Sequence, residues 1–423
     1  MKRKKDPFVW SNDMMLLILL ATAGLMAVFA VIAQPDETLF QGLLKIQLGE
    51  AGLITDPVAT GGAGAALLNG ALVLLGTTFL VWSMHLPFTG VSIACLYMMA
   101  GFSLLGKNLL NILPFLAGGL LYSAYKREPF TKYVYLTLFG TCLSPLVSFL
   151  LNRIDGWYRW PIAMLVGVIL GFFLPAVAAY TTRIHQGYNL YNVGFAAGFL
   201  GVGAASILKG FGMEFTTTGS WSTDSHGILL LFALVLLGGL FLTGVALGCR
   251  SRQDYAKILR HSGRAVADFI ILDGVPRTLV NMALVGGIGL AYLLYLYHAG
   301  VRLNGPLLCC IFSLTGFAAF GKHPKNIVPV MLGAIIAAVI MTGLPITAPG
   351  VLLATLLCTS LAPIAGQFGW FWGAVAGFLH MTIVQNTAFL HGGMNLYNNG
   401  FSAGLVCVLL VPIIEALRPE PKE

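Results

Sequence analysis

Asparagine and tyrosine side chains recur in one pattern near the end of each half of the sequence. The pattern H-x-G-x-N-L-Y-N-x-G-F-x-A-G begins at His185 and again at His391. An unpaired amide in hydrocarbon costs roughly 2 to 7 kcal/mol, so these amides must bond to neighbouring helices, to freed backbone groups or to a polar solute. One interpretation is that they only hold helices together at a break. The other is that the repeated polar residues line one central path for a small polar solute: Asn189, Tyr191, Asn192, Asn395, Tyr397 and Asn398.

Two lysines occupy equivalent places in short connections between apolar segments. Lys107 and Lys322 each follow a Phe-x-x-x-Gly sequence. They either snorkel to opposite membrane surfaces, or they mark half-helix ends inside vestibules, where paired lysines would attract an anionic solute. We include both lysines among the candidate pathway residues.

The remaining titratable residues near these motifs suit structural roles. His185 and His391 lie beside segment ends with no carboxylate nearby in the sequence, which favours interfacial structural histidines. Asp56 and Asp273, aligned with a small gap, precede the second segment of each half and are expected to cap helices. All 16 acidic residues fall outside or at the ends of apolar segments, so we expect no buried carboxylate that could bind a proton or sodium ion.

The sequence lacks the patterns of a membrane-embedded enzyme. It contains neither H-E-x-x-H nor G-x-S-x-G, and no pair of aspartates at membrane depth. The glycine-rich run at 61–66 follows no strand and fits close helix packing better than a dinucleotide turn. We therefore expect no enzymatic activity, no metal and no cofactor.

The composition places these residues in a membrane protein. Of the 423 residues 57% are apolar and 9% are charged, whereas about a quarter are charged in soluble domains. The mean hydropathy is +0.85. Soluble enzymes and nucleic-acid-binding modules are excluded, and the net charge of +8 is typical of cytoplasmic anchors beside anionic lipid.

Fourteen apolar stretches approach the roughly 20 residues that a helix needs to cross a bilayer. They lie near 14–34, 62–84, 88–106, 109–125, 131–152, 160–182, 189–212, 228–248, 275–297, 304–320, 326–342, 346–365, 369–390 and 394–414. Several are short or contain Gly, Pro and Asn, which is typical of re-entrant or broken helices. The sequence predicts an all-α polytopic membrane protein with about 10 to 14 membrane segments.

An internal repeat spans the chain. At an offset of 215 residues, 90–118 aligns with 305–333 without a gap, and the two Asn-Leu-Tyr-Asn motifs align at an offset of 206. We predict a first membrane repeat at 1–213, a polar connector at 214–227 and a second membrane repeat at 228–423, which together form one membrane domain.

The charges of equivalent loops predict that the two repeats have inverted topology. The loop at 35–61 is mainly acidic, whereas the loop at 249–277 carries six basic residues. By the positive-inside rule the N-terminus and the basic loop lie in the cytoplasm, and only Arg153 and Arg159 oppose this. Inverted repeats with broken helices are a recurring design of transporters, with the solute site where the repeats meet.

These patterns favour a transporter or channel for a small polar solute in the plasma membrane. We expect the lipid bilayer and the solute as partners, and no nucleic acid; a homo-oligomer is left open. A membrane-embedded enzyme and a structural or sensory membrane protein are the alternatives, and flux measurements in liposomes would separate them from a transporter.

Several motifs resemble one known family. The run I-T-D-P-V-A-T-G-G-A-G-A-A-L-L-N-G, the run G-F-S-L-L-G-K-N-L-L-N-I-L-P, K-R-E-P-F and the paired N-L-Y-N motifs are similar to those of a family of bacterial, mainly Firmicutes, multi-pass membrane proteins classified as a domain of unknown function. The resemblance covers nearly the whole chain and implies a plasma-membrane protein. The pseudo-symmetry is also similar to that of urea channels, whose halves carry a short Gly-Tyr/Phe-Asn stretch; 187–189 matches it and 393–395 departs from it.

Overall fold

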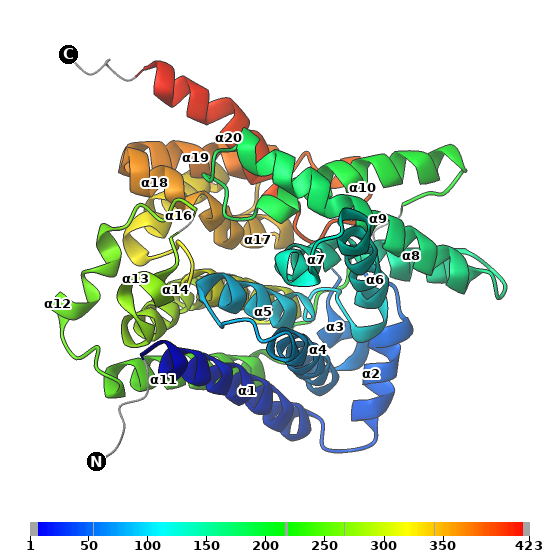
Figure 1. The fold of residues 1–423 in the computed structure, drawn as a ribbon, viewed down its shortest axis with the longest axis horizontal. Helices are drawn as coiled ribbons and strands as arrows, with labels where there is room; N and C mark the ends of the chain where they lie inside the picture. Colours follow the sequence, from blue (N-terminus) through cyan, green and yellow to red (C-terminus); the bar gives the residue numbers. More distant parts are fainter. Residues whose placement is uncertain (1–6, 54, 216–218, 266, 342, 418–423) are drawn as a thin grey trace.

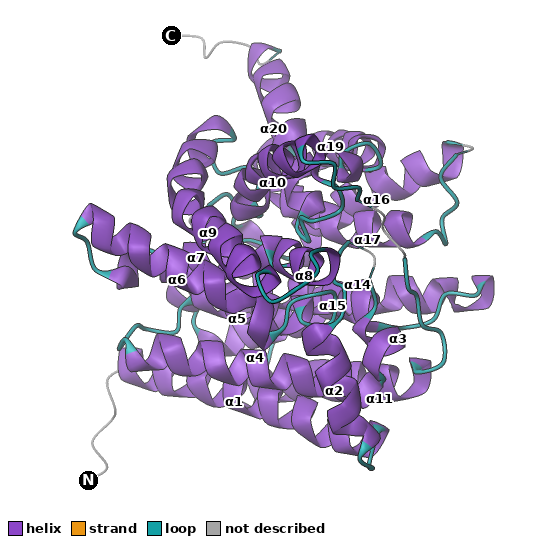
Figure 2. Cartoon of the chain, turned by 90° about the vertical axis from the view of Figure 1, so that its right-hand side faces the viewer, coloured by secondary structure: helices purple, strands orange, loops and turns teal. Residues whose placement is uncertain are grey.

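The computed structural model describes residues 7–53, 55–215, 219–265, 267–341 and 343–417. Over these ranges the chain folds into helices joined by loops, and the only extended pairing is one β-bridge between Asp268 and Phe320 (Figure 2). The predicted all-α fold class is confirmed.

Eight helical stretches of the described chain are long and apolar enough to cross a membrane. They are α1 (Pro7–Ala33), α4 (Ala63–Ser83), α9 (Arg159–Ile184), α10 (Asn192–Gly210), α11 (His226–Ala246), α14 (Val275–Tyr295), the stretch from α17 (Pro349–Leu357) through η5 (Cys358–Leu361) to α18 (Ala362–Phe368), and α20 (Asn398–Ala416). A ninth span is formed if α7 (Val134–Gly140), η2 (Thr141–Leu143) and α8 (Pro145–Arg153) are one helix bent by 42°.

The other apolar helices are shorter. They are α5 (Gly90–Phe102), α6 (Leu109–Lys126), α15 (Gly305–Phe317), α16 (Pro324–Ile340) and α19 (Trp370–Val384). With 13 residues each, α5 and α15 are about 20 Å long and cannot cross about 30 Å of hydrocarbon. Every apolar stretch predicted from the sequence coincides with a helix or a bent helical stretch.

Short helices and 3₁₀ turns connect these elements. They are α2 (Thr38–Leu48), α3 (Pro57–Gly61), α12 (Arg252–Tyr255), α13 (Phe269–Asp273), η1 (Phe130–Lys132), η3 (Ile258–Arg260), η4 (Leu296–Ala299) and η6 (Ala388–His391).

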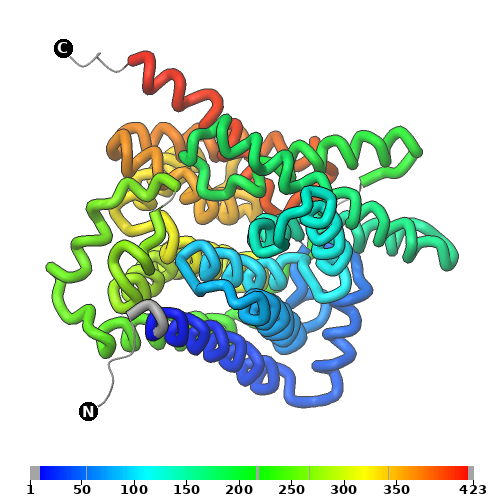
Figure 3. Tube along the Cα trace, viewed as in Figure 1, coloured from blue at the N-terminus to red at the C-terminus, as the bar shows by residue number. Residues whose placement is uncertain are grey.

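Helices from the two halves pack against each other through the middle of the molecule. The short helices α5 and α15 lie side by side in opposite directions, since Gly101 contacts Phe312 while Gly316 contacts Tyr97. On one side α1 packs beside α11, and on the other α10 packs on α20 (Figures 1 and 3). The two halves are therefore interleaved rather than separate bodies.

Two aspartates hold the starts of the central helices. Asp56 caps α3 and also accepts from the backbone N–H of Gly305 at 3.2 Å. Asp268 caps α13 and accepts from the N–H of Gly90 at 2.8 Å. In both places a five-residue helix follows the aspartate and a glycine of positive φ, 94° at 62 and 83° at 274, leads into a 21-residue helix.

The structural partner of Asp56 is thus Asp268, at an offset of 212 residues, and the predicted pairing with Asp273 is wrong. Asp273 ends α13 instead of capping a helix, and its carboxylate lies 2.8 Å from His261 Nε2. Asp56 and Asp268 are 0% and 6% exposed, so two carboxylates are buried, and the expected capping role of Asp56 is confirmed. Each is buried because it lies at a helix start that the other half covers.

Candidate functional site

The two Asn-Leu-Tyr-Asn segments cross from one half into the other at a break in a helix. Leu190 N–H donates to the carbonyl of Ser360 in η5, and Leu396 N–H donates to the carbonyl of Cys142 in η2, both at 3.0 Å. The 3₁₀ turns matter here because they expose carbonyl groups that a regular helix would use internally. Each motif therefore docks on the broken helix of the opposite half.

The first asparagine of each motif ties α10 to α20. Asn189 Nδ2 donates to the carbonyl of Gly400 at 2.9 Å, and Asn395 Nδ2 donates to the carbonyl of Gly194 at 3.2 Å. Each amide oxygen accepts from the backbone N–H two residues further on, at 2.9 Å. Both side chains are buried, so these contacts match the interpretation in which the amides hold helices together; their place in a solute path stays a prediction.

The last asparagine of each motif is bonded within its own half. Asn192 Oδ1 lies 2.8 Å from His185 Nε2, and Asn398 Oδ1 lies 2.9 Å from His391 Nε2. A threonine hydroxyl donates to each of the same oxygens. Both histidines are buried and position the motif, which agrees with the structural role expected for them.

The two lysines lie in the protein interior, so the interpretation that they snorkel to the membrane surfaces is wrong. Lys107 and Lys322 are both 0% exposed. Lys107 Nζ donates to Tyr397 Oη at 2.7 Å, and Lys322 Nζ donates to Tyr191 Oη at 2.6 Å. Each motif extends into the opposite half, so each lysine contacts the tyrosine of the other half. The lysine side chains are therefore held inside the protein and do not extend to the membrane surface.

The Lys322–Tyr191 pair is surrounded by hydroxyl groups. Lys322 Nζ also donates to Thr359 Oγ1 at 2.9 Å, and the hydroxyl of Tyr191 is bonded to that of Ser313. These four polar side chains form one continuous network.

The Lys107–Tyr397 pair is surrounded by sulfur. The second contact of Lys107 Nζ is with Met99 Sδ at 3.5 Å, and Met98 occupies the sequence position equivalent to Ser313 at an offset of 215. A thioether is a weak acceptor. The described residues offer no hydroxyl here in place of Ser313, and Tyr397 has Lys107 as its one described hydrogen-bond partner.

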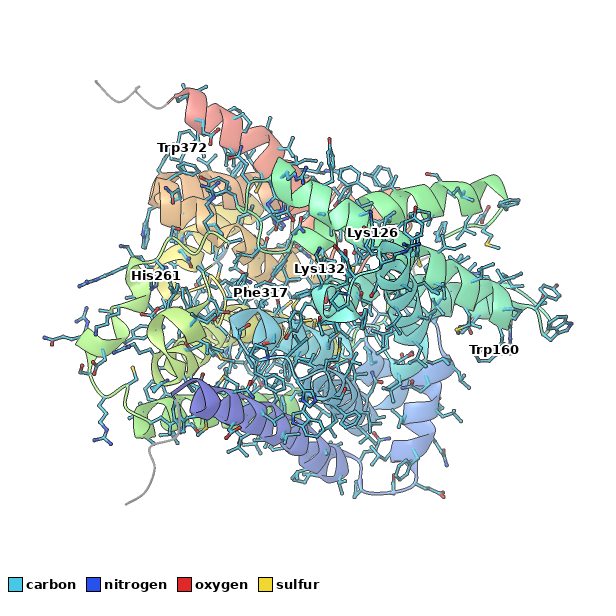
Figure 4. All side chains as sticks on the ribbon, viewed as in Figure 1. Lys126, Lys132, Trp160, His261, Phe317 and Trp372 are labelled. Carbon is cyan, nitrogen blue, oxygen red and sulfur yellow. The ribbon has the colours of Figure 1, made fainter. Side chains whose placement is uncertain are left out.

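A cavity of about 290 Å³ lies where the two motifs meet, and Tyr191 and Tyr397 both line it. Asn192 adds a polar group, while the remaining wall is mainly apolar: Val91, Met98, Leu136, Phe139, Phe317 and Phe320. Lys132, whose side chain is exposed, stands at its edge. Figure 4 labels Phe317 and Lys132 near the centre of the molecule, and Trp160 far from both at an outer end.

Two further asparagines, which the sequence did not single out, support the lysine loops. Asn69 Nδ2 donates to the carbonyl of Lys107 at 2.8 Å, and Asn281 Nδ2 donates to that of Lys322 at 2.7 Å. Asn69 and Asn281 are 212 residues apart in the sequence, which is the same offset that relates Asp56 to Asp268. This ungapped match was the signal that could have identified all four residues.

Comparison with known proteins matches two regions of the chain to one family. No curated protein and no solved structure matches the chain. A family model with the description "Protein of unknown function (DUF1576)" matches residues 35–210 and 249–416. These two regions contain both Asn-Leu-Tyr-Asn motifs and both lysines, and they leave out α1 and α11. The chain belongs to the DUF1576 family.

Proposed function

We propose that this protein is a transporter or channel for a small polar solute, with a pathway between its two halves. The observation that carries the proposal is the cavity where the two Asn-Leu-Tyr-Asn motifs meet, which is lined by one tyrosine from each motif. Solute sites of secondary transporters lie where two repeats meet and helices are broken. Both features coincide at this cavity, beside η2 and η5.

The proposed arrangement is a pair of inverted repeats with about 10 to 14 membrane segments. The pairs of equivalent contacts between the halves support a two-fold pseudo-symmetry: each half contributes one aspartate cap, one lysine–tyrosine bond and one asparagine–carbonyl bond. In this arrangement α5 and α15 enter the membrane without crossing it, since both are too short. The protein lies in the bacterial plasma membrane with its N-terminus in the cytoplasm.

The cavity then opens toward the cytoplasm. Lys132 stands at its edge, and by the positive-inside rule the basic residues at 126–132 support a cytoplasmic position for this edge. The closed side is formed by the crossing of α10 and α20, where the backbones of Gly194 and Gly400 meet. A movement of the two halves about this crossing would give alternating access.

Flux into liposomes tests this function. The purified protein is reconstituted, and uptake of a panel of neutral and anionic small solutes is measured under an imposed gradient. Leu136→Trp fills the cavity with a larger side chain, and Leu120→Trp makes the same change on an exposed face of α6. We expect uptake of at least one solute with wild type and Leu120→Trp, and none with Leu136→Trp.

The absence of flux for every solute and gradient, from correctly folded protein, would overturn the proposal. It would leave a membrane-embedded enzyme or a structural or sensory protein as the function. Equal flux through Leu136→Trp would show that the pathway lies elsewhere.

A further inference from the structure

The interior contains two lysine amines that no carboxylate contacts. The salt bridges between described residues join Lys132 to Glu128, Arg153 to Glu50 and His261 to Asp273, and none reaches Lys107 or Lys322. The buried carboxylates Asp56 and Asp268 are engaged by backbone N–H groups at helix starts. A buried charge without a counter-charge is costly, so an anion from outside would be favoured beside the lysines.

One donor beside the cavity has no acceptor. Because Lys107 donates to Tyr397 Oη, the hydroxyl proton of Tyr397 remains to be donated, and the described residues offer it no acceptor. Tyr397 is 3% exposed and lines the cavity. The equivalent hydroxyl of Tyr191 shares its proton with Ser313. Of the two lysine–tyrosine pairs, only the Tyr397 pair therefore leaves a polarised O–H group without an acceptor among the described residues. The hydroxyl of Tyr135, which lines the same cavity, has no partner among them either, but no lysine contacts it.

The cavity wall around this donor suits a ligand that is mostly apolar. Met98, Phe139 and Phe317 face the same space of about 290 Å³. Inorganic ions such as chloride or sulfate have no apolar part to place against this wall, and they would lose water on all sides without gaining enough hydrogen bonds. An organic ion with its charge at one end could pack its apolar part against these side chains while the charged end forms hydrogen bonds.

We propose that the cavity binds a small organic monocarboxylate, whose carboxylate accepts the hydroxyl proton of Tyr397. This inference names the class of solute for the proposed function. Binding of the carboxylate does not depend on that function, whereas its transport rests on it. A carboxylate in the cavity favours the charged form of Lys107, which polarises the Tyr397 hydroxyl that it contacts. A hydrogen bond to a charged acceptor is roughly twice as strong as a neutral one. The two opposite charges offset each other's cost of burial.

Calorimetric titration of the purified protein in detergent tests the ligand class with benzoate, its neutral isostere benzamide, and chloride. We expect benzoate to bind about tenfold more tightly than benzamide, since a hydrogen bond to a charged acceptor is roughly twice as strong as one to a neutral acceptor. Equal affinity for benzoate and benzamide, or tighter binding of chloride, would overturn the proposal.

Three variants locate the carboxylate. Tyr397→Phe should weaken benzoate binding about tenfold or more, whereas the matched control Tyr125→Phe, at an exposed position of α6, should leave it unchanged. Met98→Ser places a hydroxyl where the other half has Ser313, so it should capture the free proton and weaken binding in the same way. If Tyr397→Phe fails to fold, Met98→Ser alone tests the position of the carboxylate. Unchanged benzoate binding in Met98→Ser would contradict a bond between the carboxylate and the Tyr397 hydroxyl.

Binding and flux separate this inference from the proposed function. Benzoate binding without any flux would retain the carboxylate site and overturn the transporter. Flux of neutral solutes without benzoate binding would retain the transporter and overturn the carboxylate.

Discussion

The Lys107–Tyr397 and Lys322–Tyr191 pairs have the same geometry and different surroundings. The distances from lysine Nζ to tyrosine Oη are 2.7 and 2.6 Å. Ser313 and Thr359 complete the second pair with hydroxyls, whereas the first pair is completed by methionine sulfur. The comparison shows that both halves keep the lysine–tyrosine contact, while only the Tyr397 hydroxyl keeps a proton that no described residue accepts. We assign scaffolding to the second pair and solute binding to the first.

The crossing of α10 and α20 is where the halves are most alike, and there equivalent substitutions should do equal damage. A Cβ on Gly194 would meet Tyr397 Cβ and O at 2.8 Å, and one on Gly400 would meet Tyr191 O at 2.8 Å. Overpacking alone costs about 1 to 3 kcal/mol, and the asparagine–carbonyl bonds are disturbed as well. We expect Gly194→Val and Gly400→Val to lose about 3 kcal/mol or more each, measured as thermal stability in detergent.

Gly203→Val is the matched control, because no atom lies within 4 Å of a Cβ at this position of the same helix α10. It should leave stability nearly unchanged. A large loss for only one of the two crossing variants would show that the halves do not share this packing.

Asp56 should make stability depend on pH. Burial raises the pKa of its carboxyl to about 6, despite backbone N–H donors that lower it. Below the unfolded value of 3.8 both states are protonated and stability is highest. As pH rises from about 4 to about 6 the unfolded state releases its proton first, so stability falls by up to about 3 kcal/mol and then stays level.

The measurement compares the unfolding free energy of wild type and Asp56→Asn between pH 4 and pH 7. The variant should lack this fall, whatever its absolute stability. If the unfolding free energy of both proteins changed with pH in the same way, Asp56 would not be the cause of the fall.

The tyrosine pairs themselves should differ in stability. Tyr191→Phe removes an acceptor from Lys322 and breaks the bond with Ser313, whereas Tyr397→Phe breaks one described bond. We expect losses of about 2 to 3 kcal/mol for Tyr191→Phe and about 1 to 2 kcal/mol for Tyr397→Phe, from the values of charged hydrogen bonds. Unfolding in detergent measures both, and the opposite order would refute the division between scaffold and binding pair.

The smallest effect is expected at the cavity edge. Lys132 and Glu128 form an exposed pair with 2.7 Å between Nζ and Oε1, and exposed pairs contribute little because water and salt screen them. Lys132→Gln should leave the unfolding midpoint unchanged, because Glu128 keeps its bond with the hydroxyl of Tyr133. A clear destabilisation would show that the Lys132–Glu128 pair belongs to the structure of the cavity, despite its exposure.

The helices could be predicted from the sequence, but not the contacts between the halves. Apolar length located every long helix of the described chain, because it is a property of neighbouring residues. The burial of Lys107 could not be predicted, since its partner Tyr397 lies 290 residues away and composition alone favours snorkelling. Similarly, the gapped alignment selected Asp273, although the ungapped offset of 212 relates Asp56 to Asp268 and Asn69 to Asn281.

The central claim is that solute passes the Tyr397 side of the cavity. Benzoate uptake into liposomes containing wild type, Tyr191→Phe or Tyr397→Phe tests it most directly, at equal amounts of folded protein. We predict uptake by wild type, retention of most of it in Tyr191→Phe, and a loss of about tenfold or more in Tyr397→Phe. Equal uptake by the two variants, whether retained or lost, would contradict it.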